Sequence, residues 1–292
     1  MIPVRGNALL ALGAAVFWGG GDFAGGMGVK TAGGSLRSAL RVVLLSHAAS
    51  FTALVLIALA RGDRFPHGAP LAWAIAAGVA GGASLTCFYI ALSHGAMGVS
   101  AAVSGLLAAA IPAAFTLWQQ GPPGVQPAVG FAVAALAIWL VAAGPPAIPG
   151  NGRGTALLAT LAGVGFGLYF IALRYASPAG VVWPMANARI GSLSACSLLA
   201  LVLGRARPGA PALRLPRRAA ACALGAALFD TSGNLLFIAA TRAGRLDIAS
   251  VLASLYPAST ILLAALVLSE RPTRRQALGM ATAVLAVILI AL

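Results

Sequence analysis

Residues 70–93 read PLAWAIAAGVAGGASLTCFYIALS and contain no charged residue. A stretch of this length can cross the hydrocarbon core of a bilayer, because a spanning helix needs about 20 mainly apolar residues. Irregular backbone cannot face lipid, so a long apolar run in a membrane must be helical. The stretch therefore predicts a transmembrane helix.

Further apolar runs lie on both sides of this stretch. Polar residues, prolines or arginines separate most of them, as at 61–64 and 121–123, and the weakest break, at 93–98, has no charge. The sequence predicts ten spanning helices at 8–28, 36–60, 70–93, 97–118, 126–143, 154–175, 180–203, 217–240, 246–268 and 274–292.

The composition supports a membrane protein. The chain is 60% hydrophobic and only 8% charged, against about 25% charged residues in a typical soluble domain. A net charge of +14 could indicate nucleic-acid binding, but the basic residues punctuate the apolar runs and form no patch, so we expect no nucleic-acid partner. The abundance of Ala, Gly and Arg favours a bacterial source, and we expect a multi-pass protein of the plasma (inner) membrane.

The sequence repeats itself at a shift of about 148 residues. Matching positions include Ala8-Leu9-Leu10-Ala11 with Ala156-Leu157-Leu158-Ala159, Arg41 with Arg189, Tyr89-Ile90-Ala91 with Phe237-Ile238-Ala239, and Pro112 with Pro257. Each unit holds five helices, and five is odd, so the second unit enters the membrane from the opposite side. We therefore predict one integral membrane domain of two inverted repeats, 1–147 and 148–292, which is typical of secondary transporters with a midplane site.

Several segments resemble one known family. They are Ala249-Ser250-Val251-Leu252-Ala253-Ser254-Leu255-Tyr256-Pro257, Leu268-Ser269-Glu270-Arg271, Gln276-Ala277-Leu278-Gly279, Trp18-Gly19-Gly20-Gly21-Asp22-Phe23, and Trp183-Pro184 with Ala188-Arg189. With these residues the whole chain resembles the EamA family of the drug/metabolite transporter superfamily. The resemblance implies an all-α fold of ten helices in two inverted five-helix repeats, with a central cavity lined by helices 1–4 and 6–9. The first half departs from the pattern because it lacks an equivalent of Glu270.

Two of the five acidic residues, Asp22 and Asp230, lie in the interior of predicted spans, whereas Asp247 is at the start of its span and is expected to be interfacial. A charge at the bilayer centre costs about 3 kcal/mol or more, so such residues are rare and commonly functional. Burial favours the neutral form of a carboxylate, which suits reversible protonation. One or both acids are therefore candidates for coupling transport to protons. The alternative is a structural role, near a helix end or paired with Arg41 or Arg189.

Arg41 and Arg189 are the basic residues that lie more than two residues from either end of a predicted span, and they hold equivalent positions in the two repeats. Arg189 lies about nine residues into its run, too deep for easy snorkelling to the interface. It could bind an anionic group of the substrate or tie helices together through an acid or backbone carbonyls. Arg41 is nearer its helix end, which favours snorkelling.

Prolines and aromatic–polar pairs complete the set of pathway candidates. Proline removes one intrahelical hydrogen bond, and helix breaks at matching sites in two repeats indicate a transporter site, although a packing kink is the alternative. A spacing of four residues places two side chains on one helix face. The candidates are Pro112 with Tyr256-Pro257, a third break at Trp183-Pro184, and the pairs Trp18 with Asp22, Trp183 with Asn187, and Asp230 with Asn234.

Membrane orientation stays open at this point. Outside the spans, eleven basic residues fall in odd-numbered loops and six at the N-terminus and even-numbered loops, which places both termini outside by the positive-inside rule. The family resemblance implies both termini in the cytoplasm.

A secondary transporter of a small metabolite, working by alternating access, is the leading prediction. No Walker motif is present, so the energy would come from an ion gradient, such as protons, from exchange or from the substrate's own gradient, and the direction could be export. The alternatives are an intramembrane enzyme or a non-transporting membrane subunit. His47, His94 and the three cysteines have no metal-ligand spacing, and we expect no catalytic residue, no metal, no cofactor, and a monomer or homodimer.

Overall fold

The computed structural model describes residues 4–94, 97–142, 152–205, 215–268 and 273–291. Every regular element within these ranges is a helix. In chain order the elements are α1 (Val4–Thr31), α2 (Leu36–Ala60), α3 (Ala69–His94), α4 (Met97–Gln120), α5 (Val125–Ala142), α6 (Gly152–Ala176), the 3-10 helix η1 (Ser177–Ala179), α7 (Val182–Arg205), α8 (Arg217–Ala243), α9 (Leu246–Ala253), α10 (Tyr256–Leu268) and α11 (Arg274–Ala291).

Eight segments of this structure are long and apolar enough to cross a bilayer. One of them, Leu246–Val267, runs over both α9 and α10, and a shorter apolar helix lies at Val125–Leu140 within α5. Each of the ten predicted apolar runs is mainly helical where the structure describes it, with non-helical residues at 180–181 and 254–255. The prediction of an all-helical chain with the apolar helices of a polytopic membrane protein is therefore confirmed, whereas ten crossings in inverted repeats stay a prediction.

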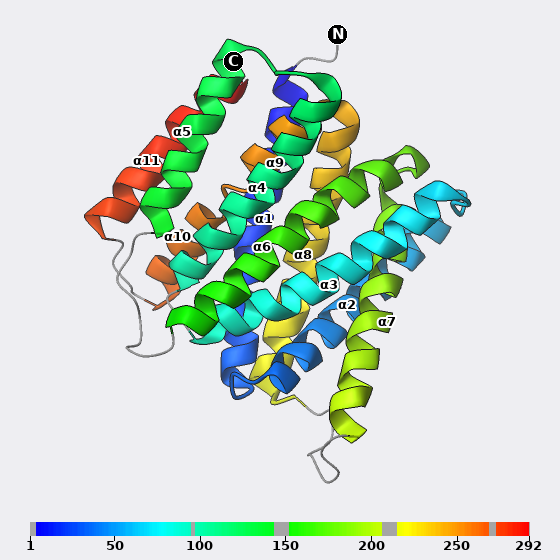
Figure 1. Ribbon diagram of the computed structural model, residues 1–292. Helices are drawn as coiled ribbons and strands as arrows, with labels where there is room; N and C mark the ends of the chain where they lie inside the picture. The colour runs from blue at the N-terminus through cyan, green and yellow to red at the C-terminus, as the bar shows by residue number, and fades with distance from the viewer. Residues whose placement is uncertain (1–3, 95–96, 143–151, 206–214, 269–272, 292) are drawn as a thin grey trace.

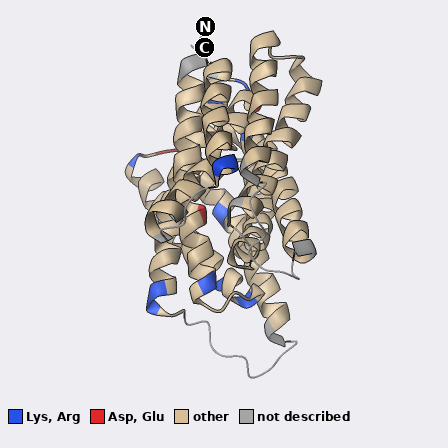
Figure 2. Cartoon of the chain, turned by 90° about the vertical axis from the view of Figure 1, so that its left-hand side faces the viewer, with Lys and Arg blue, Asp and Glu red and all other residues tan. Residues whose placement is uncertain are grey.

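The outside of the bundle carries large apolar side chains. Leu201, Leu228 and Leu266 are each more than 60% exposed. Figure 2 shows that charged residues are sparse along the bundle, with several basic positions near its lower end. Soluble monomers rarely expose contiguous apolar patches larger than a few hundred Å2, so this surface fits a lipid environment.

Helices from the first half of the chain pack against helices from the second half. The main partners are α1 with α8, α3 with α6 and α7, α2 with α7, and α5 with α11. Figure 1 shows α5 and α11 side by side at one edge and α7 at the opposite edge. The crossing of α3 and α7 is so close that it tolerates no side chain at two glycines. A Cβ at Gly78 would lie 1.8 Å from the Ala188 carbonyl oxygen, and one at Gly191 would lie 2.1 Å from the Ile75 carbonyl oxygen. Small residues at such crossings let helix backbones touch, as is common between membrane helices.

The helix breaks differ between the two predicted proline sites. The chain leaves α9 after Ala253 and resumes a helix at Tyr256, whereas α4 is continuous through Pro112. The end of α9 tightens because the Leu255 amide donates to the Leu252 carbonyl, and Pro257 then occupies the first turn of α10, where its missing N–H leaves no bond unmade. Matching helix breaks were predicted, and only the second half has one within the described residues.

The two ends of the described chain meet at one end of the bundle. Figure 1 shows that α1 begins and α11 finishes there, and we call this the termini end. The Asn7 side-chain amide on α1 also donates to the Arg245 carbonyl before α9, which places that turn at the same end. The predicted repeat boundary at 147/148 and the residues Glu270 and Arg271 lie outside the described residues.

Candidate functional site

A buried ion pair lies inside the helical bundle. Arg189 on α7 pairs through its guanidinium with the carboxylate of Asp230 on α8, and the two side chains are 5% and 14% exposed. Nε of Arg189 also donates to Ser50 Oγ at 2.9 Å, and its third nitrogen contacts His47 Nε2 at 2.8 Å. All three guanidinium nitrogens therefore have partners from α2 or α8.

The protonation of His47 follows from these contacts. Arginine can only donate hydrogen bonds, so His47 Nε2 must accept, and the ring proton lies on Nδ1. Nδ1 then donates to Ser192 Oγ at 2.5 Å, and that hydroxyl donates to the Arg189 carbonyl at 3.2 Å. The imidazole is thus neutral and orients Arg189. The sequence analysis treated His47 as structural or interfacial, and the structure gives it this orienting contact.

A contact between two hydroxyl groups completes the network. Ser50 Oγ lies 2.6 Å from Thr231 Oγ1, so α2 contacts α8 directly beside the ion pair. The network ties α2, α7 and α8 together around Asp230. Of the two roles predicted for Arg189, pairing with an acid matches this arrangement, and no guanidinium nitrogen is left without a protein partner here.

Asp22 on α1 lies beside the network but outside its hydrogen bonds. Its residue is 8% exposed, and it interacts electrostatically with Asp230 across the α1–α8 contact. Within the described ranges no hydrogen-bond donor or cation is paired with its carboxylate. Asp22 lines a small internal cavity of about 40 Å3 together with Asp230 and Asn234.

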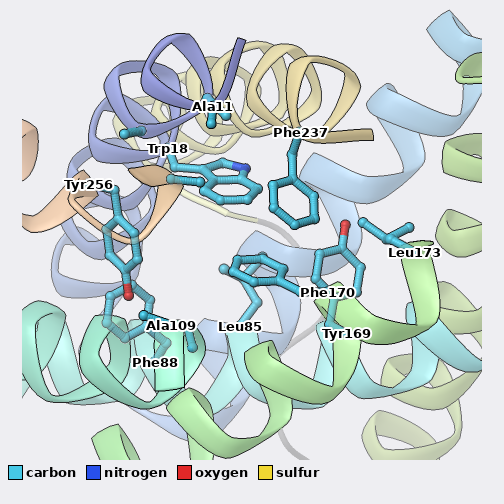
Figure 3. Packing of buried hydrophobic residues seen from close by; sticks show 14 of the residues in the cluster. Ala11, Trp18, Leu85, Phe88, Ala109, Tyr169, Phe170, Leu173, Phe237 and Tyr256 are labelled. Atoms are coloured by element: carbon cyan, nitrogen blue, oxygen red, sulfur yellow. The ribbon is translucent and has the colours of Figure 1, made fainter. Parts of the chain in front are cut away.

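Aromatic side chains form most of the remaining wall of this cavity. They are Trp18, Phe166, Tyr169, Phe170 and Tyr256. Figure 3 shows Trp18 next to Phe170 and Phe237, with Tyr256 on the other side of Trp18. The Trp18 and Phe170 rings stack with centroids 5.1 Å apart, and Tyr256 meets Trp18 edge-on at 6.5 Å. Such packing fixes the ring positions.

Polar tips hold two of these rings in place. Tyr169 donates from its hydroxyl to Asn234 Oδ1 at 2.6 Å, and the Asn234 amide donates to the Asp230 carbonyl at 2.7 Å. The Tyr256 hydroxyl lies 2.6 Å from Ser104 Oγ on α4. These bonds link the cavity walls to Asp230 and, through Tyr256, to α4 beside the break between α9 and α10.

Glycines allow α1 to approach its neighbours at this level. A Cβ at Gly19 would lie 2.3 Å from Ser259 Cβ on α10, and one at Gly21 would lie 3.2 Å from the Asp230 amide nitrogen. Real Cβ atoms essentially never make non-bonded contacts shorter than 3.0 Å, so α1 and α10 can pack this closely only because Gly19 has no side chain. The Gly19-Gly20-Gly21 run therefore explains how Asp22 comes to face Asp230.

The structure brings some of the predicted residues together. Those at the cavity are Trp18, Asp22, Asp230, Asn234 and Tyr256, with Arg189 bound to Asp230. Sequence reasoning did not select the residues that complete the site, which are His47, Ser50, Ser104, Tyr169 and Ser192. Each is a polar or aromatic residue inside an apolar run, and that pattern was the available signal.

Other predicted residues lie elsewhere. Trp183 sits at the start of α7, where its indole N–H donates to the Asp63 carbonyl at 2.8 Å and its ring meets Phe65 edge-on. Asn187 is fully buried on α7, and both polar atoms of its side chain lack a partner in the described structure. Arg41 is partly buried on α2. None of the three lines the cavity around Asp22.

A larger pocket of about 450 Å3 lies at the termini end. The ends of α4, α6 and α8 form it, and its lining includes Gln119, Arg174, Tyr175 and Arg242. Both arginines donate to backbone carbonyls, Arg174 to Thr241 and Arg242 to Ser177. No group of three or more residues suited to holding a metal occurs among the residues that the structure describes.

Comparisons with known proteins agree with this fold. Residues 153–292 match the family model of the EamA-like transporter family. No curated protein matches the sequence. A solved structure, described only as a crystal structure of a protein, resembles this one with a TM-score of 0.68 at 17% identity, covering 97% of this chain and 95% of that chain. That likeness shows the fold alone.

Proposed function

We propose, from the premise that residues 153–292 belong to the EamA-like transporter family of the drug/metabolite transporter superfamily, that this chain is a secondary transporter of a small metabolite. The observation that carries the proposal is the buried, charged cavity in the middle of an apolar bundle. Asp22 on α1 and Asp230 on α8 face one internal space that aromatic side chains enclose. Ionisable groups at such depth in a membrane protein mark substrate or ion pathways far more often than packing sites.

The pairing of helices supports a two-fold relation between the halves 1–147 and 148–292. If α1–α5 correspond to α6–α11, with α9 and α10 counted as one helix, then the α1–α8 contact corresponds to the α6–α3 contact. The contacts of α2 with α7 and of α5 with α11 map onto themselves. A two-fold relation between the halves gives this exchange of partners, which is compatible with inverted repeats of ten crossings and accords with a site between the halves.

Two cavities of different size support alternating access. The space at Asp22 measures about 40 Å3, which is room for very few water molecules, whereas the pocket at the termini end measures about 450 Å3. We propose that this conformation is closed around an empty centre. Movement of the halves would open the centre to one side of the membrane at a time.

Proton coupling is the version of the proposal that Asp22 and Asp230 favour. Asp230 is paired with Arg189, whereas Asp22 has no cation among the described groups. A proton binding to Asp230 would therefore compete with Arg189, and a proton binding to Asp22 would displace no cation. A proton on Asp22 removes an unpaired buried charge. We further propose a bacterial plasma-membrane protein that acts as a monomer or homodimer.

Two steps test the transport proposal. A thermal-shift screen of the purified protein against a metabolite panel identifies a solute that binds, because a ligand preferring the folded state raises the melting temperature. Counterflow of that labelled solute in proteoliposomes then measures transport. We expect protein-dependent accumulation that Asp230→Asn abolishes and Asp63→Asn leaves unchanged, since Asp63 pairs with Arg61 at the exposed surface. A solute that binds but shows no counterflow would overturn the proposal.

A further inference from the structure

The charges around the central cavity do not balance. Among the described residues the cluster holds two carboxylates, Asp22 and Asp230, and one guanidinium, Arg189. His47 contributes no charge, because its Nε2 accepts from Arg189. With both acids ionised, the cluster lacks one positive charge, and Asp230 already holds the only arginine of the cluster.

The missing charge belongs at Asp22. The Asp22 residue is 8% exposed, and its side chain lines the cavity without a hydrogen bond to any described residue. Transfer of an isolated carboxylate out of water is costly unless a cation or proton compensates it. An anionic ligand is therefore excluded at this position, and a cationic one would be stabilised.

The lining of the cavity favours an organic cation over a metal ion. Five aromatic side chains line the cavity at Asp22, and its second carboxylate, Asp230, is already paired with Arg189, whereas hard metal cations need several oxygen ligands. Aromatic rings attract ammonium groups through the negative charge of their faces, and cages of such rings recognise quaternary ammonium groups. Trp18 precedes Asp22 by four residues on α1, so the indole and the carboxylate project from the same helix face into the cavity.

We propose that the Asp22 cavity binds a small organic monocation, an amine or quaternary ammonium compound, as the substrate class of this protein. The proposal rests on the transport function proposed above and deepens it. One ammonium group pairs with the Asp22 carboxylate and contacts the aromatic wall, while Arg189 stays on Asp230. The cavity must widen to admit more than the smallest cation, and the break beside Tyr256 provides a wall segment that is not a continuous helix.

Protons compete with this cation for the same carboxylate. The titratable groups that the described structure places around Asp22 and its cavity are Asp230 from α8, Tyr256 from α10, Tyr89 from α3 and Tyr169 from α6. None of the tyrosines offers a cation, so the choice at Asp22 is between a proton and the ammonium group. Binding should therefore weaken as the pH falls.

The test compares a cation with its neutral shape-mate. Choline and 3,3-dimethyl-1-butanol have nearly the same shape and differ by one positive charge. Binding of each probe to the purified full-length protein is measured by calorimetry at alkaline and at mildly acidic pH. We expect saturable binding of choline, at least about tenfold tighter than the alcohol, which corresponds to about 1.4 kcal/mol. We also expect weaker choline binding at the lower pH.

Three variants locate the site. Asp22→Asn should abolish choline binding, Trp18→Leu should weaken it, and Asp63→Asn should leave it unchanged. Size-exclusion profiles and melting temperatures establish that each variant is folded. Because the wild-type comparison of choline with the alcohol needs no variant, the proposal stays testable even if Asp22→Asn does not fold.

The outcomes separate this inference from the transport proposal. Equal affinity for choline and the alcohol, no binding of either, or choline binding that persists in folded Asp22→Asn would overturn the cation site. If counterflow of another solute is then observed, the transport function stands without it. Choline binding at Asp22 together with a lack of any counterflow would instead support the site and overturn the transporter.

Discussion

Removal of one partner from the Arg189–Asp230 pair should destabilise the protein strongly. The two side chains are 5% and 14% exposed, and breaking a buried ion pair by removing one partner costs about 3–5 kcal/mol. Asp230→Asn belongs at the lower end, about 3 kcal/mol, because Asp22 lies close enough to compensate part of the freed guanidinium charge.

The partner variant should cost more. Arg189→Met leaves Asp230, like Asp22, without a cation. It also removes the donors to Ser50 and His47. Each lost hydrogen bond adds roughly 1 kcal/mol, so the total lies near 5 kcal/mol. The double variant Arg189→Met/Asp230→Asn has no separated ion pair, and we expect it to be more stable than Arg189→Met alone by about 2 kcal/mol.

The assay is reversible unfolding of the four proteins by SDS in mixed micelles, followed by tryptophan fluorescence. The free energies of unfolding form a double-mutant cycle, whose coupling term reports the pair itself. Strict additivity, with the double variant as unstable as the sum of the single ones, would refute the reasoning. Such a result would mean that water or lipid headgroups solvate both charges.

Three further outcomes follow from the geometry. Gly19→Val should lower the free energy of unfolding in SDS by about 3 kcal/mol or more, because its Cβ collides with α10. Gly6→Ala on the same helix meets no atom within 4 Å and should be neutral or stabilising by up to about 1 kcal/mol in the same assay. Asp22→Asn should raise the melting temperature and increase the free energy of unfolding by about 1–3 kcal/mol, because it removes an unpaired buried charge. The same change should impair function. Trp183→Phe should cost about 1 kcal/mol through the lost bond to the Asp63 carbonyl and leave solute counterflow unchanged, and a transport defect would contradict its position outside the cavity.

The sequence was sufficient for the helical architecture and for the acids inside it. Apolar runs of spanning length leave the backbone no alternative to a helix, which is why all ten predicted runs are mainly helical where described. The depth of Asp230 and Arg189 in their runs made pairing one of the predicted alternatives for each, since an isolated charge at that depth is costly. Arg189 was one of two named partners for the acids, and only the approach of α7 to α8 selects it for Asp230.

The rest of the site depends on contacts between distant segments. Ser50, Ser192 and Ser104 are ordinary residues within membrane helices. Only the crossing of α2 with α7 or of α4 with α10 makes them partners of Arg189, His47 and Tyr256, respectively. Helical periodicity gives the face on which a side chain lies but not its depth. Trp183 was therefore grouped with pathway residues, although its indole holds the 61–68 loop at the termini end.

The glycine crossings described above constrain how this molecule can change shape. Where Gly78 and Gly191 bring α3 and α7 into backbone contact, and where Gly21 does so for α1 and α8, neither helix can slide along the other without a collision. These seams should behave as rigid joints that move as units, α1 with α8 and α3 with α7. The ion pair between Arg189 on α7 and Asp230 on α8 connects the two units. The two units should therefore separate only when this ion pair breaks.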